Sequence, residues 1–149
     1  MTLMAINCSM VQAAGSERWD AVSNTAASIT GNIEFSPVRL RFQGGQTLEL
    51  ALQGKQKGFK ADGDVVHAQV YKVLQPVDLV LQKGNRLCGG KIARPVRWVL
   101  AWTPEALPGD STPLGLAFSS GETAPTTSTG ADSCGTYNYE LAAPTKAKR

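Results

Sequence analysis

Residues 38–52 read V-R-L-R-F-Q-G-G-Q-T-L-E-L-A-L, and apolar residues alternate with polar or small ones on both sides of Gly44 and Gly45. This period of two indicates extended backbone, because successive side chains of a strand point to opposite faces of the sheet. The paired glycines supply the positive φ angles of a tight turn. The stretch therefore predicts a β-hairpin with one apolar face. That face comprises Val38, Leu40, Phe42, Leu48, Leu50 and Leu52.

Short alternating segments separated by turn residues occur through the rest of the chain. They are residues 29–35, 65–73, 77–82, 96–102, 114–118 and 136–141. Fifteen glycines and eight prolines also favour a turn-rich β protein. The pattern predicts an all-β fold of about eight antiparallel strands in a small barrel or sandwich. Residues 16–28 are the least strand-like, and the spacing of Trp19, Val22 and Ala26 predicts at most a short N-terminal helix there.

Residues 1–15 carry no charge and are too short to span a bilayer, which takes about 20 apolar residues. Small side chains at Val11 and Ala13 match the positions that a signal peptidase reads. We therefore expect the remnant of a secretory signal peptide whose start lies upstream, and a periplasmic or secreted protein. The alternatives are a frayed arm or short helix, or a lipoprotein acylated at Cys8.

The cysteines agree with export. Removal of the signal would remove Cys8 and leave Cys88 and Cys134, an even number that predicts one disulfide. The alternative is two reduced, buried thiols in a cytosolic protein. The chain has one histidine and no Cys-x-x-Cys spacing, so we predict no metal site.

The formal net charge of +3 is a property of the C-terminus. Lys146, Lys148 and Arg149 lie in an expected flexible basic tail, residues 142–149, whereas the single domain expected over residues 16–141 holds 12 acidic and 12 basic side chains. Proteins that bind nucleic acid usually present a basic patch on the folded body. We therefore expect no nucleic-acid partner.

Two segments are expected to form loops. Residues 53–64 contain three glycines and place Lys55, Lys57 and Lys60 around Phe59, a candidate contact site for an acidic partner. In the alternative interpretation, this is a solvated connection whose Phe59 packs onto the core. Residues 119–133 have few large apolar groups and are expected to form a mobile loop.

The residues needed for catalysis do not come together in the sequence. His67 is the only histidine and lies within an expected strand, and no Gly-x-Ser-x-Gly motif occurs. Asp62, Asp64 and Asp78 could approach one another, which leaves a carboxylate-based hydrolase as an alternative, but a solvated edge is the simpler interpretation. No glycine-rich nucleotide motif has the required strand–loop–helix context. We predict no enzymatic activity and no cofactor.

Two functions remain. The first is an exported, non-enzymatic domain that binds a protein or cell-envelope partner through its loops, as an inhibitor would. The second is a lipocalin-like carrier of a small apolar ligand, with a cavity lined by Trp98, Trp102, Tyr137 and Tyr139. If both line one core, the Trp98–Trp102 face must meet the apolar face of the hairpin at residues 38–52. Residues 133–137 resemble, over five positions and with different spacing, a serine-glycine-tyrosine loop of one group of bacterial lysozyme inhibitors, and we assign no family from them.

Overall fold

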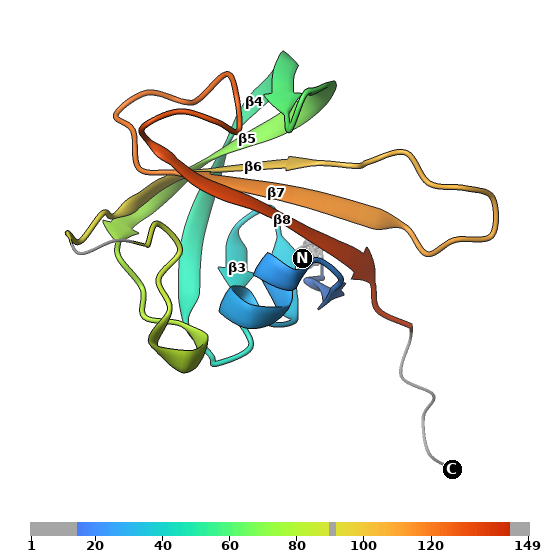
Figure 1. Ribbon diagram of the computed structural model, residues 1–149, viewed down its shortest axis with the longest axis horizontal. Coiled ribbons are helices and arrows are strands. Elements are labelled where there is room, and N and C mark those ends of the chain that lie inside the picture. Colours follow the sequence, from blue (N-terminus) through green and yellow to red (C-terminus); the bar gives the residue numbers. More distant parts are fainter. Residues whose placement is uncertain (1–14, 90–91, 144–149) are drawn as a thin grey trace, which may run out of the picture.

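The computed structural model describes residues 15–89 and 92–143 and shows a closed barrel of antiparallel strands (Figure 1). Each strand pairs with the next along the chain, and β1 pairs with β8 to close the barrel. The prediction of a small all-β barrel is confirmed. The strands are β1 (Glu17–Ala21), β2 (Ile33–Ser36), β3 (Arg39–Arg41), β4 (Thr47–Ala61), β5 (Asp64–Val77), β6 (Val96–Trp102), β7 (Pro113–Ser119) and β8 (Ser133–Leu141).

Three segments differ from the expectation. Residues 16–28 contain a strand, β1, followed by the start of a short π-helix, η1 (Ala26–Thr30). Residues 53–64 are not a loop, because β4 and β5 continue through them as a long hairpin that extends beyond the other strands. Residues 77–82 are not a strand, because β5 ends at Val77 and the chain then forms a connection with one short helical turn, η2 (Gln82–Gly84). Residues 1–14 of the predicted signal remnant, which include Cys8, and the last six residues lie outside the described part of the chain.

Side chains fill the barrel interior. Its largest fully buried members include Tyr71, Tyr137 and Tyr139. Each hydroxyl has a partner: Tyr71 donates to Gln69 Oε1 at 2.6 Å, and Tyr137 is 3.3 Å from the carbonyl oxygens of two residues. Tyr139 lies 2.7 Å from the hydroxyl of buried Thr30. Because the polar tips are satisfied, large aromatic rings can occupy the interior at little desolvation cost.

The buried tyrosines predict a loss of stability at high pH. Burial raises the pKa of Tyr137 from 10.0 to about 12, and it also raises the pKa of Tyr139. Above pH 10 the unfolded chain therefore releases phenolic protons that the folded chain retains. We expect full stability below that pH and a loss of about 1.4 kcal/mol per pH unit for each such tyrosine as the pH rises toward 12. Urea unfolding at a series of pH values, with tyrosinate absorbance followed in parallel, measures this. A flat stability profile between pH 9 and pH 12 would show that the rings are accessible to water.

A second apolar cluster lies on the outside of the barrel wall. In β6, Val99 and Ala101 belong to the interior, so strand alternation places Leu100 and Trp102 on the outer face. We call this set the outer cluster; it comprises Phe59, Ala61, Ala68, Val70, Leu100, Trp102 and Ala117, with Val66, Trp98 and Ala124 packed against them. The expectation that Trp98 and Trp102 face the hairpin of residues 38–52 inside one core is therefore wrong.

Gly115 of β7 makes room for the Trp102 indole. A Cβ atom at this position would collide with the indole ring, whereas a Cβ atom at Gly58 of β4 would meet open space. We expect Gly115→Ala to displace Trp102 and to lower the free energy of unfolding by about 1–3 kcal/mol, the usual cost of overpacking. The matched control, Gly58→Ala, should change it by less than about 1 kcal/mol. Chemical denaturation of both variants compares them, and equal stabilities would mean that Trp102 moves aside freely.

Residues 120–132 cover the outer cluster, and we call them the capping loop. Ala124 packs against the cluster, and Trp98 Nε1 donates to the Gly121 carbonyl at 3.0 Å. The backbone of Ser128 donates to the Lys60 carbonyl at 2.8 Å. The segment expected to be a mobile loop without core contacts therefore packs against the barrel. Small side chains permit this, because they let the backbone approach the hairpin closely enough for hydrogen bonds.

Candidate functional site

The β4–β5 hairpin carries the lysine-rich segment that the sequence singles out. Phe59 is fully buried in the outer cluster, with its ring 5.6 Å from that of Trp102. Lys55, Lys57 and Lys60 are exposed. Among the described residues, none of these three lysines forms an ion pair. The structure thus separates the predicted contact set into an aromatic residue that stabilises the hairpin and three unpaired cations that face solvent.

The tip of the hairpin is held by Asp62. Its backbone N–H donates to Ser128 Oγ at 2.9 Å, and its carboxylate accepts from the hydroxyls of Ser128 at 3.2 Å and Thr136 at 2.7 Å. These contacts join the tip to the capping loop and to β8. Asp62 has a positive φ of 49°, a conformation that Asp tolerates in turns. The hairpin therefore presents its lysines on a fixed backbone.

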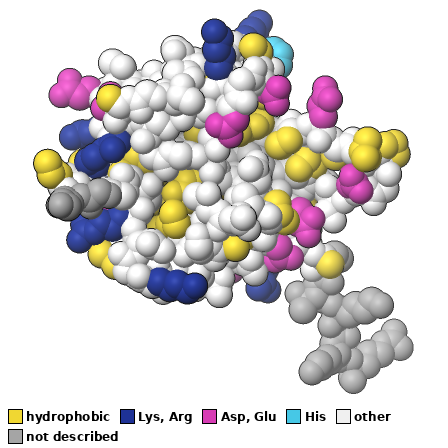
Figure 2. Space-filling model, viewed as in Figure 1, with side chains coloured by type: hydrophobic (Ala, Val, Ile, Leu, Met, Phe, Trp, Pro, Cys, Tyr) yellow, Lys and Arg dark blue, Asp and Glu magenta, His cyan; other side chains and the backbone are white. Residues whose placement is uncertain are grey.

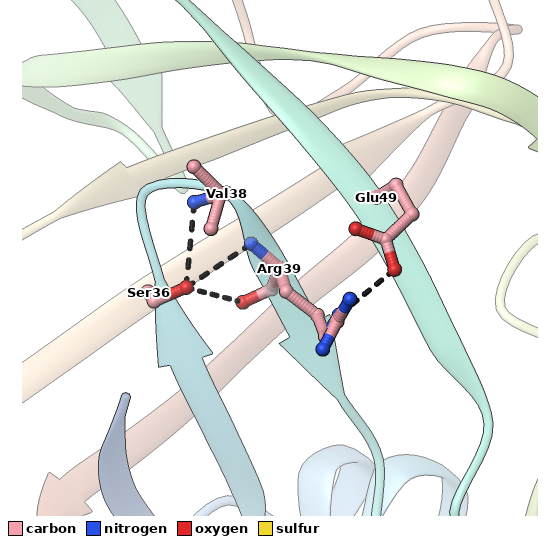
Figure 3. A network of polar contacts seen from close by, with 4 residues as sticks. All are labelled: Ser36, Val38, Arg39 and Glu49. Carbon is pink, nitrogen blue, oxygen red and sulfur yellow. Dashed lines mark hydrogen bonds and ion pairs between the residues drawn. The ribbon is translucent and has the colours of Figure 1, made fainter. Parts of the chain in front are cut away.

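The pairing of β4 with β3 ends at the β2–β3 turn (Figure 3). Ser36 Oγ accepts from the backbone N–H groups of Val38, at 3.3 Å, and Arg39, at 3.1 Å, which closes the turn. Arg39 then pairs with Glu49 of β4 at 2.8 Å. Figure 3 shows β4 continuing past this turn, so its outer end extends beyond β3.

A cleft of about 260 Å³ lies at the mouth of the barrel beside the extended hairpin, and we call it the mouth cleft. It is lined by Phe35, Lys55, His67, Gln69, Ala101, Trp102, Thr103 and Leu114. Its walls are apolar on the β2 and β7 sides and polar on the hairpin side. Figure 2 shows lysine or arginine side chains beside the single histidine at the top of the view, over β4 and β5. No carboxylate lines this cleft.

A larger open cleft, about 760 Å³, shares His67, Trp102 and Thr103 with the mouth cleft and includes Asp62, Asp64 and Glu105. The Asp62 carboxylate accepts hydrogen bonds from two hydroxyl groups. Asp78 lies elsewhere and pairs with Arg86. Of the three aspartates considered for a hydrolase, Asp62 and Asp64 thus share one cleft, and Asp78 does not line it. In residues 15–89 and 92–143, no group of three or more His, Cys, Asp or Glu side chains is arranged to hold a metal ion.

The four residues proposed to line a carrier cavity lie on two sides of the barrel wall. Tyr137 and Tyr139 are inside, and Trp98 and Trp102 belong to the outer cluster. The segment that resembles an inhibitor loop, residues 133–137, forms the start of β8, and its Tyr137 is only 1% exposed. The four residues therefore do not line one cavity, although Trp102 contributes to the mouth cleft.

The disulfide is as predicted. Cys88 and Cys134 are bonded with an S–S distance of 2.02 Å and link the β5–β6 connection to the start of β8. The guanidinium of Arg94 lies beside this bond, where it donates to Ser120 Oγ at 3.1 Å and to the Ser133 carbonyl at 3.3 Å. The bond therefore stabilises the end of the capping loop.

Comparison of the chain with protein-family models, with curated proteins and with solved structures finds no match. Among the described residues, no helix combines the length and apolar character needed to cross a membrane.

Proposed function

We propose that this protein is an exported, non-enzymatic β-barrel protein that binds an acidic protein or cell-envelope partner through the exposed lysines of its β4–β5 hairpin. The observation that carries this proposal is the set of three exposed cations, Lys55, Lys57 and Lys60, with no ion-pair partner among the described residues, on a hairpin whose tip is bonded to two other segments. A surface whose backbone is already ordered loses little conformational entropy when a partner binds.

Packing of the interior favours surface binding over transport of a small ligand. A carrier requires a cavity of several hundred Å³. The inward positions are instead taken by bulky side chains such as Tyr71, Phe118 and Tyr137, and the rings of Phe118 and Tyr137 are 5.1 Å apart. These bulky inward side chains disfavour the lipocalin-like alternative.

Export is supported by the disulfide. Disulfides form and persist in oxidising compartments such as the periplasm or the extracellular medium. The bond between Cys88 and Cys134 is consistent with either location. The pattern of residues 1–15, of which 1–14 lie outside the described residues, supplies the second argument for export.

Charge reversal on the hairpin tests the proposal. The double variant Lys55→Glu/Lys57→Glu replaces two exposed cations and removes no buried group, so we expect its stability to change by about 0.5 kcal/mol or less. Recovery of the partner from a cell-envelope extract should fall by about tenfold or more, because attraction between opposite charges becomes repulsion. Affinity capture followed by mass spectrometry measures recovery, and a melting curve measures stability.

The matched control is Lys72→Glu, which reverses an exposed lysine on β5 away from the hairpin tip. It should leave recovery unchanged. Recovery by the wild type should also weaken as salt is added, because exposed charges are screened. Equal recovery by all three proteins, or no partner recovered by the wild type, would contradict the proposal.

A further inference from the structure

One edge of β4 has no hydrogen-bonding partner over its middle part. β4 pairs with β3 only from Thr47 to Glu49, and the Leu50 N–H then donates to the Val38 carbonyl at 2.9 Å. The next backbone bond on this edge joins the Lys60 N–H to the Thr126 carbonyl at 3.1 Å. Between these points, in the described part of the chain, the β4 backbone is paired only with β5. We call residues 53–58 the free edge.

The free edge has the composition of a protected strand. It reads Q-G-K-Q-K-G, and five of its six residues are exposed. Lysines on an edge strand discourage pairing with apolar or cationic strands, which is a common protection against aggregation. The same lysines favour a strand that carries carboxylates, because cross-strand pairs of opposite charge are stabilising. The same lysines would thus serve in protection and in selective recognition. An edge that is only protected does not pair with an acidic strand, whereas an edge used for recognition does.

Two other occupants that this chain itself offers are disfavoured by charge. A second copy would bring its own Lys55 and Lys57 against the same residues, and like charges directly opposite one another are destabilising. The C-terminal residues contribute Lys146, Lys148 and Arg149, which are also cationic. An acidic segment of a different protein avoids both conflicts.

The surroundings of the free edge fit an added strand. The mouth cleft lies beside Lys55 and has Phe35 and Leu114 in its apolar wall. Val38 and Leu52, which lie where β3 pairing ends, are 59% and 52% exposed. A strand alternates its side chains between two faces, so an added segment would direct every second side chain toward the mouth cleft. Because Lys55 lines the same cleft, these positions suit carboxylates, and the positions between them suit apolar residues.

We propose that the partner is recognised by strand addition: an extended acidic segment pairs its backbone with the free edge of β4, between Val38 and Thr126, and places carboxylates beside Lys55 and Lys57. This inference rests on the proposed function and specifies its mode. Main-chain hydrogen bonds supply affinity in this mode, and the side chains supply specificity. The free edge of six residues, about 20 Å at 3.3 Å per residue, is long enough for a short segment.

The test uses a blocked peptide of about seven residues that alternates glutamate with valine, matched to the length of the free edge. Amide hydrogen exchange of residues 53–58 is followed by NMR while the peptide is titrated to about 1 mM, where weak complexes are populated. We expect exchange at the free edge to slow about tenfold or more, and exchange in β7 to stay unchanged. N-methylation of alternate peptide nitrogens on the pairing side, or lysine in place of glutamate, should abolish the effect.

The result also separates this inference from the proposed function. Strand addition is overturned if amide exchange at the free edge does not slow, or if it still slows with the N-methylated peptide. If Lys55→Glu/Lys57→Glu nevertheless loses the partner from the extract, binding by the lysines stands without strand addition. Slowing with the acidic peptide that disappears in the same double variant supports strand addition. Slowing with the lysine peptide as well would reveal an unselective edge and would overturn the proposed recognition of acidic segments.

Discussion

Replacement of Cys88 and Cys134 together by alanine is expected to lower the free energy of unfolding by about 4 kcal/mol. The disulfide joins residues separated by 46 positions, and its loss restores the corresponding chain entropy to the unfolded state. For a domain of this size, the loss corresponds to a decrease of about 10 °C in the melting temperature. Calorimetry of the double variant and the wild type under non-reducing conditions measures the difference.

The control for this prediction is the wild type treated with a reductant, which breaks the same bond without changing any side-chain volume. It should melt close to the double variant. If both melt within about 2 °C of the oxidised wild type, the cross-link contributes little, and the Arg94 contacts to Ser120 and Ser133 already order the capping loop.

Phe59→Ala is expected to cost about 3–5 kcal/mol, the usual loss for removing a buried phenylalanine. The side chain is fully buried between the hairpin and the capping loop and lies 5.6 Å from the Trp102 ring. Its removal should also increase hydrogen exchange at Ser128, whose N–H donates to the Lys60 carbonyl. Denaturant unfolding and hydrogen–deuterium exchange measure the two effects.

Lys57→Ala is the neighbouring control, because this side chain is exposed and is expected to change stability by about 0.5 kcal/mol or less. The two variants therefore separate the structural residue of the segment from a residue assigned to binding. A Phe59→Ala protein that keeps the wild-type stability but loses its partner would contradict the burial of Phe59 and return it to the binding surface.

The hairpin at residues 38–52 could be predicted because both of its faces are distinct in the sequence. Strict alternation and the paired glycines, Gly44 and Gly45, describe local backbone geometry, and the structure places β3 and the start of β4 there. β6 could not be oriented in the same way. Both of its faces are apolar, so a period of two does not reveal which face points inward. The outer cluster that buries Trp102 therefore could not be predicted from the sequence.

The candidate site was predictable only in part. The sequence places three lysines around Phe59, which suggests a contact site, and it contains the two cysteines that are bonded. It does not reveal that Phe59 is buried, because the capping loop that covers the outer cluster is more than 60 residues away in the chain. Nor does it reveal the free edge, which exists because β4 has 15 residues and β3 has three.

We expect the partner to contact the lysine-bearing surface of the β4–β5 hairpin. The most direct measurement introduces a photocrosslinking amino acid in place of Gln53 in one protein and of Leu107 in another, since both side chains are exposed, Gln53 precedes the lysines on β4, and Leu107 lies in the β6–β7 connection. After irradiation in an envelope extract, we expect a cross-linked adduct for position 53 and none for position 107. An adduct for position 107 alone, or none for position 53, would show that the partner binds elsewhere.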